Sequence, residues 1–171
     1  LFSMGYKKAA WSYWETRFDC IDAPERIGLP EKKWQRGDSG KEKLLVCSEQ
    51  GIGDEILYLS CLPDLLRDQT AIVVECDNRW KKLFERSFPS ITVVSRQIDY
   101  KEDDEVFYDY REVVTTNNIN SYVLNGDLPA FYRYSLCESV SSKGYLKADP
   151  VRIKKFEYVL DKISSKTLIG I

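Results

Sequence analysis

The segment LLVCSEQGIGDEI, residues 44–56, decides the fold. Its first four residues form a continuous apolar run, which is what a strand covered on both faces requires. A turn with two glycines follows, and residues 54–68 then carry apolar side chains at helical spacing. Pro63 predicts a kink in this helix, because proline removes one backbone donor. A buried strand, a glycine-containing turn and a helix in succession are typical of an α/β protein.

The alternation of strand and helix continues along the chain. Short runs of apolar and β-branched residues predict further strands at 71–76, 91–94 and 106–108. Helices are expected after a cap at Asp77 or Asn78, over 128–137, and from the Asp149-Pro150 pair to residue 163. This rhythm predicts a Rossmann-like three-layer sandwich, in which helices cover both faces of a mostly parallel sheet.

The residues before this alternation read differently. Residues 2–18 carry two apolar stripes at helical spacing, so we expect a short helical segment with two packing partners. Residues 19–42 contain too much proline and glycine for a regular helix and are expected to form a connector. Trp34 is expected to anchor this connector to the domain surface. Residues 167–171 read as a strand that begins and is cut off, which predicts a fragment of a longer protein.

Composition excludes several classes of function. The 171 residues include 25 Lys and Arg against 27 Asp and Glu, a balance that does not favour a nucleic-acid surface. Histidine is absent, which excludes Ser-His-Asp triads, Cys-His pairs and His-ligated zinc. The five cysteines lack C-x-x-C spacing, and this favours a reduced, cytoplasmic protein over a disulfide scaffold. The sequence contains neither a membrane-spanning apolar run nor an evident signal peptide.

The turn at residues 48–56 is the place where chemistry is expected, because ligands of open α/β sheets bind beyond the carboxyl ends of the strands. A dinucleotide site is disfavoured: Ile56 replaces the third glycine of G-x-G-x-x-G, and Asp54 and Glu55 would repel the pyrophosphate, although Glu75 lies at a suitable distance. A phosphate loop is not supported, since Gly-Lys-Ser and Gly-Lys-Thr are missing. Asp54 at a helix start is either a simple N-cap or an ionised proton acceptor facing the cleft.

Four segments together resemble a known group of proteins. Glu49-Gln50-Gly51-x-Gly53-Asp54, followed by Leu62-Pro63-x-Leu65-Leu66, resembles the start of glycosyltransferases related to the heptosyltransferases of family nine, in the version that follows tetratricopeptide repeats in bacterial proteins. The other matching segments are Trp11-x-x-Trp14-Glu15-x-Arg17, Trp34 with Gly40-Lys41, and residues 144–150. The resemblance covers residues 5–171.

The resemblance implies the amino-terminal half of a GT-B fold. Residues 1–18 would end a tetratricopeptide-like repeat, 19–42 would be a linker, 43–166 the Rossmann-like acceptor-side half-domain, and 167–171 the first strand of the half that binds the nucleotide sugar. The resemblance implies that Asp54 is the catalytic base and that neither a metal nor another cofactor is needed. Glu49, Gln50, Gly51 and Gly53 would then contact the acceptor or donor, with the glycines providing the tight turn and a close approach.

Some residues depart from this pattern or carry other candidate chemistry. Glu55 stands where the group usually has a small residue, and residues 107–135 resemble the group only loosely. The acidic run 102–105 is interpreted as a solvated loop rather than a metal site. The aromatic side chains form either a sugar-stacking surface or, as we favour, ordinary packing; they are Tyr108, Tyr110, Tyr132 and Tyr134, with Arg133 among them.

Two functions are therefore expected. The first is the acceptor-side half of a metal-independent inverting glycosyltransferase that uses a nucleotide-sugar donor and a hydroxyl acceptor, and that is inactive as this chain alone. The second is a non-catalytic scaffold, in which Trp11, Trp14 and Phe18 belong to a surface that binds a protein partner. A stand-alone nucleotide-binding domain is a third, weaker alternative.

Overall fold

A computed structural model describes residues 6–18, 23–39, 41–100, 105–133 and 144–162. The strands are β1 (Glu25–Ile27), β2 (Lys32–Lys33), β3 (Lys43–Cys47), β4 (Ala71–Cys76), β5 (Thr92–Ser95), β6 (Asp99–Tyr100), β7 (Val106–Asp109) and β8 (Ser121–Leu124). The helices are α1 (Lys7–Trp14), α2 (Ile52–Leu59), α3 (Leu62–Asp68), α4 (Lys81–Ser87), α5 (Arg111–Asn117), α6 (Leu128–Tyr132) and α7 (Pro150–Asp161), with short 3-10 turns η2 (Glu15–Phe18) and η3 (Asn125–Asp127).

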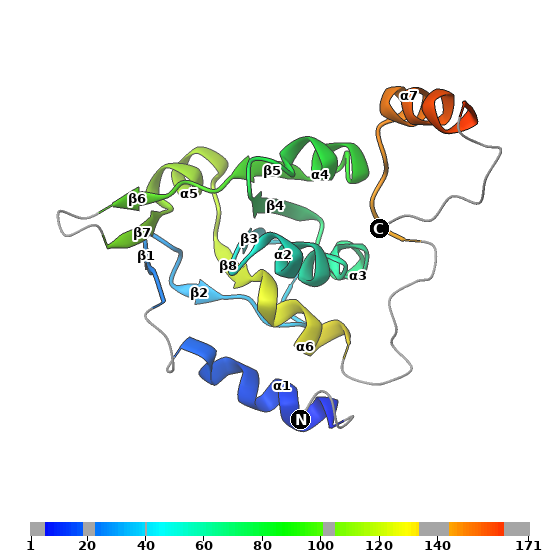
Figure 1. Cartoon of the computed structure of the whole chain (residues 1–171). Coiled ribbons are helices and arrows are strands. Elements are labelled where there is room, and N and C mark those ends of the chain that lie inside the picture. The colour runs from blue at the N-terminus through cyan, green and yellow to red at the C-terminus, as the bar shows by residue number, and fades with distance from the viewer. Residues whose placement is uncertain (1–5, 19–22, 40, 101–104, 134–143, 163–171) are drawn as a thin grey trace.

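The main sheet has five strands in the order β2-β8-β3-β4-β5, and all of its pairings are parallel. Alternate residues of each strand point to opposite faces of the sheet. Leu44 and Val46 of β3 join the core beneath α2, α3, α4 and α6, whereas Leu45 and Cys47 join the core beneath α5. Helices thus cover both faces (Figure 1), and the predicted Rossmann-like three-layer α/β fold is confirmed.

The predicted helix over 54–68 is two helices. α2 ends at Leu59, and α3 begins at Leu62 with Pro63 in its first turn. Proline is tolerated there because the first backbone N–H groups of a helix have no partner within the helix. Pro63 therefore marks the start of a new helix rather than a kink within one.

The strand at 106–108 was expected to continue the main sheet, and it does not. β7 pairs in parallel with β1 and antiparallel with β6, in a separate three-stranded sheet. The additional strand of the main sheet is β8, which pairs with β3 and with β2. The expected connector over 19–42 consequently contributes one short strand to each sheet, although it contains no regular helix among its described residues.

The N-terminal helix packs on the α/β body, whereas the C-terminal helix projects from it. The expected helix over 2–18 is described from residue 6, as α1 and the turn η2, and lies beside α6 (Figure 1). Trp34 is 1% exposed and meets Phe131 edge-on, so its predicted anchoring role is confirmed. α7 has Asp149 as its predicted cap and projects from the body. The predicted strand at 167–171 lies outside the described residues.

Candidate functional site

The turn after β3 lies at the carboxyl edge of the main sheet, as the sequence predicted. Because all five strands are parallel, the residues after β3, β4, β5 and β8 meet at this edge. The left-handed residue of the turn is Gln50, with φ 58°, whereas Gly51 is extended and Gly53 lies within α2. The expectation that the glycines provide the tight turn is therefore wrong. Gly53 is exposed, and a Cβ atom built on it would meet nothing within 4 Å, so the surface above it is open.

Asp54 stands in the first turn of α2, half-buried beside this open surface. Its Oδ2 accepts a hydrogen bond of 3.3 Å from the backbone N–H of Gly51. This contact closes the start of the helix, and the partial positive charge of a helix N-terminus favours a carboxylate at that place. The N-cap of α2 is Gly51, so the expectation that Asp54 is the N-cap is wrong: Asp54 is the third residue of the helix, and its side chain reaches back to the N-cap backbone. It is also an acid that solvent can reach.

Glu49 was expected to contact a ligand, but it is 2% exposed. Its two carboxylate oxygens accept hydrogen bonds from Nε and Nη2 of Arg17, at 3.1 and 3.0 Å. Burial raises the pKa of Glu49, and the pairing with Arg17 opposes that rise. Gln50 is exposed, and its Oε1 accepts a hydrogen bond from the Tyr58 hydroxyl at 3.1 Å. The structure therefore brings Gln50, Gly51, Gly53 and Asp54 to the surface and turns Glu49 away from it.

Glu55 connects the loops after three neighbouring strands, a role that the sequence did not reveal. Its side chain is fully buried, and it accepts hydrogen bonds from the Ser48 hydroxyl and from Arg96. Its Oε2 also accepts from the backbone N–H of Asp77 at 3.1 Å. Ser48, Asp77 and Arg96 follow β3, β4 and β5 respectively. Glu55, which departs from the resembled pattern, therefore joins the loops that lie beneath Asp54.

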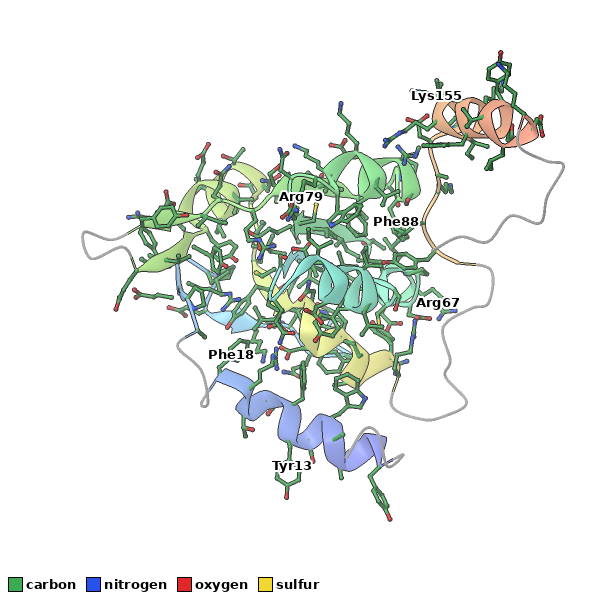
Figure 2. All side chains as sticks on the ribbon, in the orientation of Figure 1. Tyr13, Phe18, Arg67, Arg79, Phe88 and Lys155 are labelled. Carbon is green, nitrogen blue, oxygen red and sulfur yellow. The ribbon has the colours of Figure 1, made fainter. Side chains whose placement is uncertain are left out.

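The place where the strand order reverses is filled by Arg17. The chain passes from β3 to β4 and β5 and then returns to β8 on the other side of β3, and ligands of doubly wound sheets bind at such a point. Arg17 enters here from η2 and donates to Glu49 and, at 2.8 Å, to Asp127 after β8. Figure 2 shows the neighbouring Phe18 directed towards the sheet, whereas Tyr13 points away from it.

Aromatic, basic and glycine residues complete the surroundings of Arg17 and its two acidic partners. Its guanidinium stacks over Phe18 at 4.2 Å from the ring centroid, and Lys33 pairs with the second oxygen of Asp127 at 2.9 Å. Gly126 lies so close to Glu49 that a Cβ atom there would meet Glu49 Oε1 at 1.7 Å. The resemblance included Arg17 in its motif, but nothing in the sequence pointed to acidic partners 32 and 110 residues away.

Glu75, which the dinucleotide interpretation would place against a ribose, is 4% exposed. Its Oε2 accepts hydrogen bonds from the Ser48 backbone N–H at 2.7 Å and from the Tyr110 hydroxyl at 3.1 Å. Burial raises the pKa of Glu75 to about 7, and these hydrogen bonds oppose the rise. This buried acid belongs to the opposite face of the sheet from α2 and the exposed side of Asp54.

The remaining candidates are buried, half-buried or outside the described residues, and Tyr108 and Arg133 are the half-buried ones. Tyr110 is 2% and Tyr132 is 6% exposed, which supports the packing interpretation for both. Tyr134 and residues 102–104 lie outside the described residues. Within the described ranges, no three His, Cys, Asp or Glu side chains are grouped so that they could hold a metal ion. In the same part of the chain, no helix is both long enough and apolar enough to span a bilayer.

Comparison with known proteins finds a distant sequence similarity. Protein FlbA of Caulobacter vibrioides is 27% identical to it over 177 aligned residues, which include the whole of this chain. The chain spans 29% of the length of FlbA. No protein-family model and no solved structure matches the chain. The similarity to FlbA therefore runs through both the α1 segment and the α/β body.

Proposed function

We propose that this chain is the acceptor-side half of a metal-independent inverting glycosyltransferase, in which Asp54 is the catalytic base. The observation that supports this most is the position of Asp54 at the carboxyl edge of an all-parallel sheet, beside the open surface above Gly53. A carboxylate within hydrogen-bond reach of a hydroxyl can accept its proton during attack. The resemblance to the heptosyltransferase-related group supplies the reaction class.

The proposed reaction is a single displacement. Asp54 removes the proton of an acceptor hydroxyl as that oxygen bonds to the anomeric carbon of the donor sugar. The bond between the anomeric carbon and the nucleoside diphosphate breaks on the opposite side, and configuration inverts. The nucleotide would be held by a second half-domain in the longer protein, since FlbA is itself more than three times as long as this chain. Reduced, buried cysteines suit a cytoplasmic protein, where such donors are made.

A second candidate function is a scaffold without catalysis. The observation that favours it is the closure of the switch point by Arg17, which occupies the place where a ligand of such a sheet usually binds. Of the residues expected in the partner surface, Trp14 packs on Tyr58 and Phe18 packs on the core. The exposed face of α1, including Tyr13 at 66% exposure, would therefore dock a protein partner.

A donor screen on the full-length protein distinguishes the two functions. The protein is incubated with hydroxyl acceptors and a panel of nucleotide sugars, and release of nucleoside diphosphate is measured. The enzyme proposal expects acceptor-dependent release with at least one donor. It also expects none from the 171-residue chain alone, because the proposal assigns donor binding to a half-domain outside these residues. Absence of release with every donor, from a full-length protein that is folded, supports the scaffold.

A further inference from the structure

A cavity of about 300 Å³ lies between α5 and strands β4 and β5, near the carboxyl edge of the sheet. Its apolar lining comes from Leu45, Val94 and Val113. The exposed residues Gln97, Glu112 and Thr116 line it on the solvent side. Its size falls at the lower end of pockets that take small molecules.

The cavity exists because helices are distributed unequally over the sheet. α2, α3, α4 and α6 pack on one face, whereas among the described helices α5 alone packs on the other (Figure 1). α5 connects β7 with β8, and Val113 contributes to the core over Leu45. The face above Val94 at the β5 end is consequently left as a hollow.

The base of the cavity presents the carboxyl group of Glu75. Only Oε2 accepts the hydrogen bonds that the described residues donate to Glu75, from Ser48 and Tyr110. Because Glu75 lines the cavity, its carboxyl group can meet a group that enters there.

The charges around the cavity nearly cancel. Asp109 is paired with Arg111, whose Nε donates to it at 2.9 Å. Glu112 and Lys81 contribute one negative and one positive charge to the lining. A phosphate would face the carboxyl groups of Glu75 and Glu112, with only Lys81 to offset them. A cation would face Glu75 at the bottom of the cavity, and this carboxyl group is partly protonated near neutral pH. The lining suits an uncharged ligand with many hydroxyl groups.

We infer that this cavity binds a neutral, monosaccharide-sized polyol, with its C–H face on Val94 and Val113 and a hydroxyl group at Glu75. The strand residues form the apolar floor, and Gln97 and Asn117 offer amide groups to ring hydroxyls. This site lies on the opposite face of the sheet from α2, so the inference does not depend on the chemistry proposed for Asp54.

The test is a titration of the isotope-labelled 171-residue chain, followed by amide chemical shifts. The probes are the methyl glycosides of glucose, galactose, mannose and N-acetylglucosamine, together with inositol, and glucosamine as a charged ring of the same size. We expect saturable shifts at Val94, Val113 and Tyr110 with at least one neutral probe, at a half-saturation on the order of millimolar.

Two neighbouring exposed residues of α5 provide matched variants. Thr116→Trp fills the mouth of the cavity and should weaken binding by roughly tenfold or more. Thr115→Trp makes the same change at a position that does not line it, and should bind as the wild type does. The inference is overturned if no neutral probe shifts these amides, if glucosamine alone does, or if both variants bind equally.

Discussion

At the residue scale, four acids near one edge of the sheet have different environments. Glu49, Glu55 and Glu75 are buried and hydrogen-bonded, whereas Asp54 is half-buried at an open surface. Adjacent helical positions point about 100° apart, so Asp54 and Glu55 lie on different sides of α2, one at the surface and one in the interior. The spacing of the sequence placed both acids at a helix start, but it did not show that Ser48, Asp77 and Arg96 surround Glu55 and hold it turned inward.

Glu75 should make the stability of the protein depend on pH. Its pKa rises from 4.5 when unfolded to about 7 when folded, so the folded state binds more protons between these values and stability falls as pH rises through them. Glu75→Gln keeps an oxygen for Ser48 and Tyr110 and cannot ionise. Relative to the wild type, the variant should gain up to about 3 kcal/mol between pH 4.5 and pH 8.

Urea unfolding at several pH values measures this difference. Glu85→Gln, at an exposed position of α4, serves as the control and should follow the wild type throughout. A constant difference between Glu75→Gln and the wild type across this pH range would show that Glu75 does not titrate as described.

At the element scale, η2 after α1 is fastened to the sheet by Arg17. Arg17→Met keeps the aliphatic stem but leaves Glu49 and Asp127 buried without their shared cation. Removal of one partner from a buried ion pair costs about 3 kcal/mol or more, so we expect a lower urea midpoint. Arg79→Met removes a guanidinium that pairs with Asp77 at the exposed surface, and its midpoint should stay close to that of the wild type. Equal midpoints for the two variants would mean that Arg17 does not fasten η2.

The elements show which part of the fold the sequence could predict. β3, β4 and β5 are local runs of apolar residues, and each lies within a residue or two of its predicted place. β8 was missed, because its four residues lie between Asn117-Asn118 and Asn125-Gly126-Asp127, which both read as turns. β7 was predicted as a strand, but it belongs to the small sheet because it pairs with β1. The paired residues Glu25 and Phe107 are 82 residues apart in the sequence. Such pairings depend on the tertiary fold rather than on local pattern.

At the scale of the whole molecule, three of the five cysteines lie in the core. Cys47, Cys61 and Cys76 are 0% exposed, and burial raises the pKa of Cys61 to about 11 and that of Cys76 to about 12. A thiol reacts as its thiolate. We therefore expect a thiol reagent at pH 8 to modify at most two of the five cysteines before unfolding. Rapid modification of a third would contradict the described core.

The most direct test of the proposed catalysis is the turnover of the full-length protein with Asp54→Asn. The asparagine oxygen can still accept from Gly51, so the helix start is preserved while the base is lost. Asp77→Asn, at the same edge of the sheet, is the control. We predict that Asp54→Asn lowers kcat about 10²–10⁴-fold and that Asp77→Asn leaves it near the wild-type value. A wild-type rate for Asp54→Asn would contradict the account.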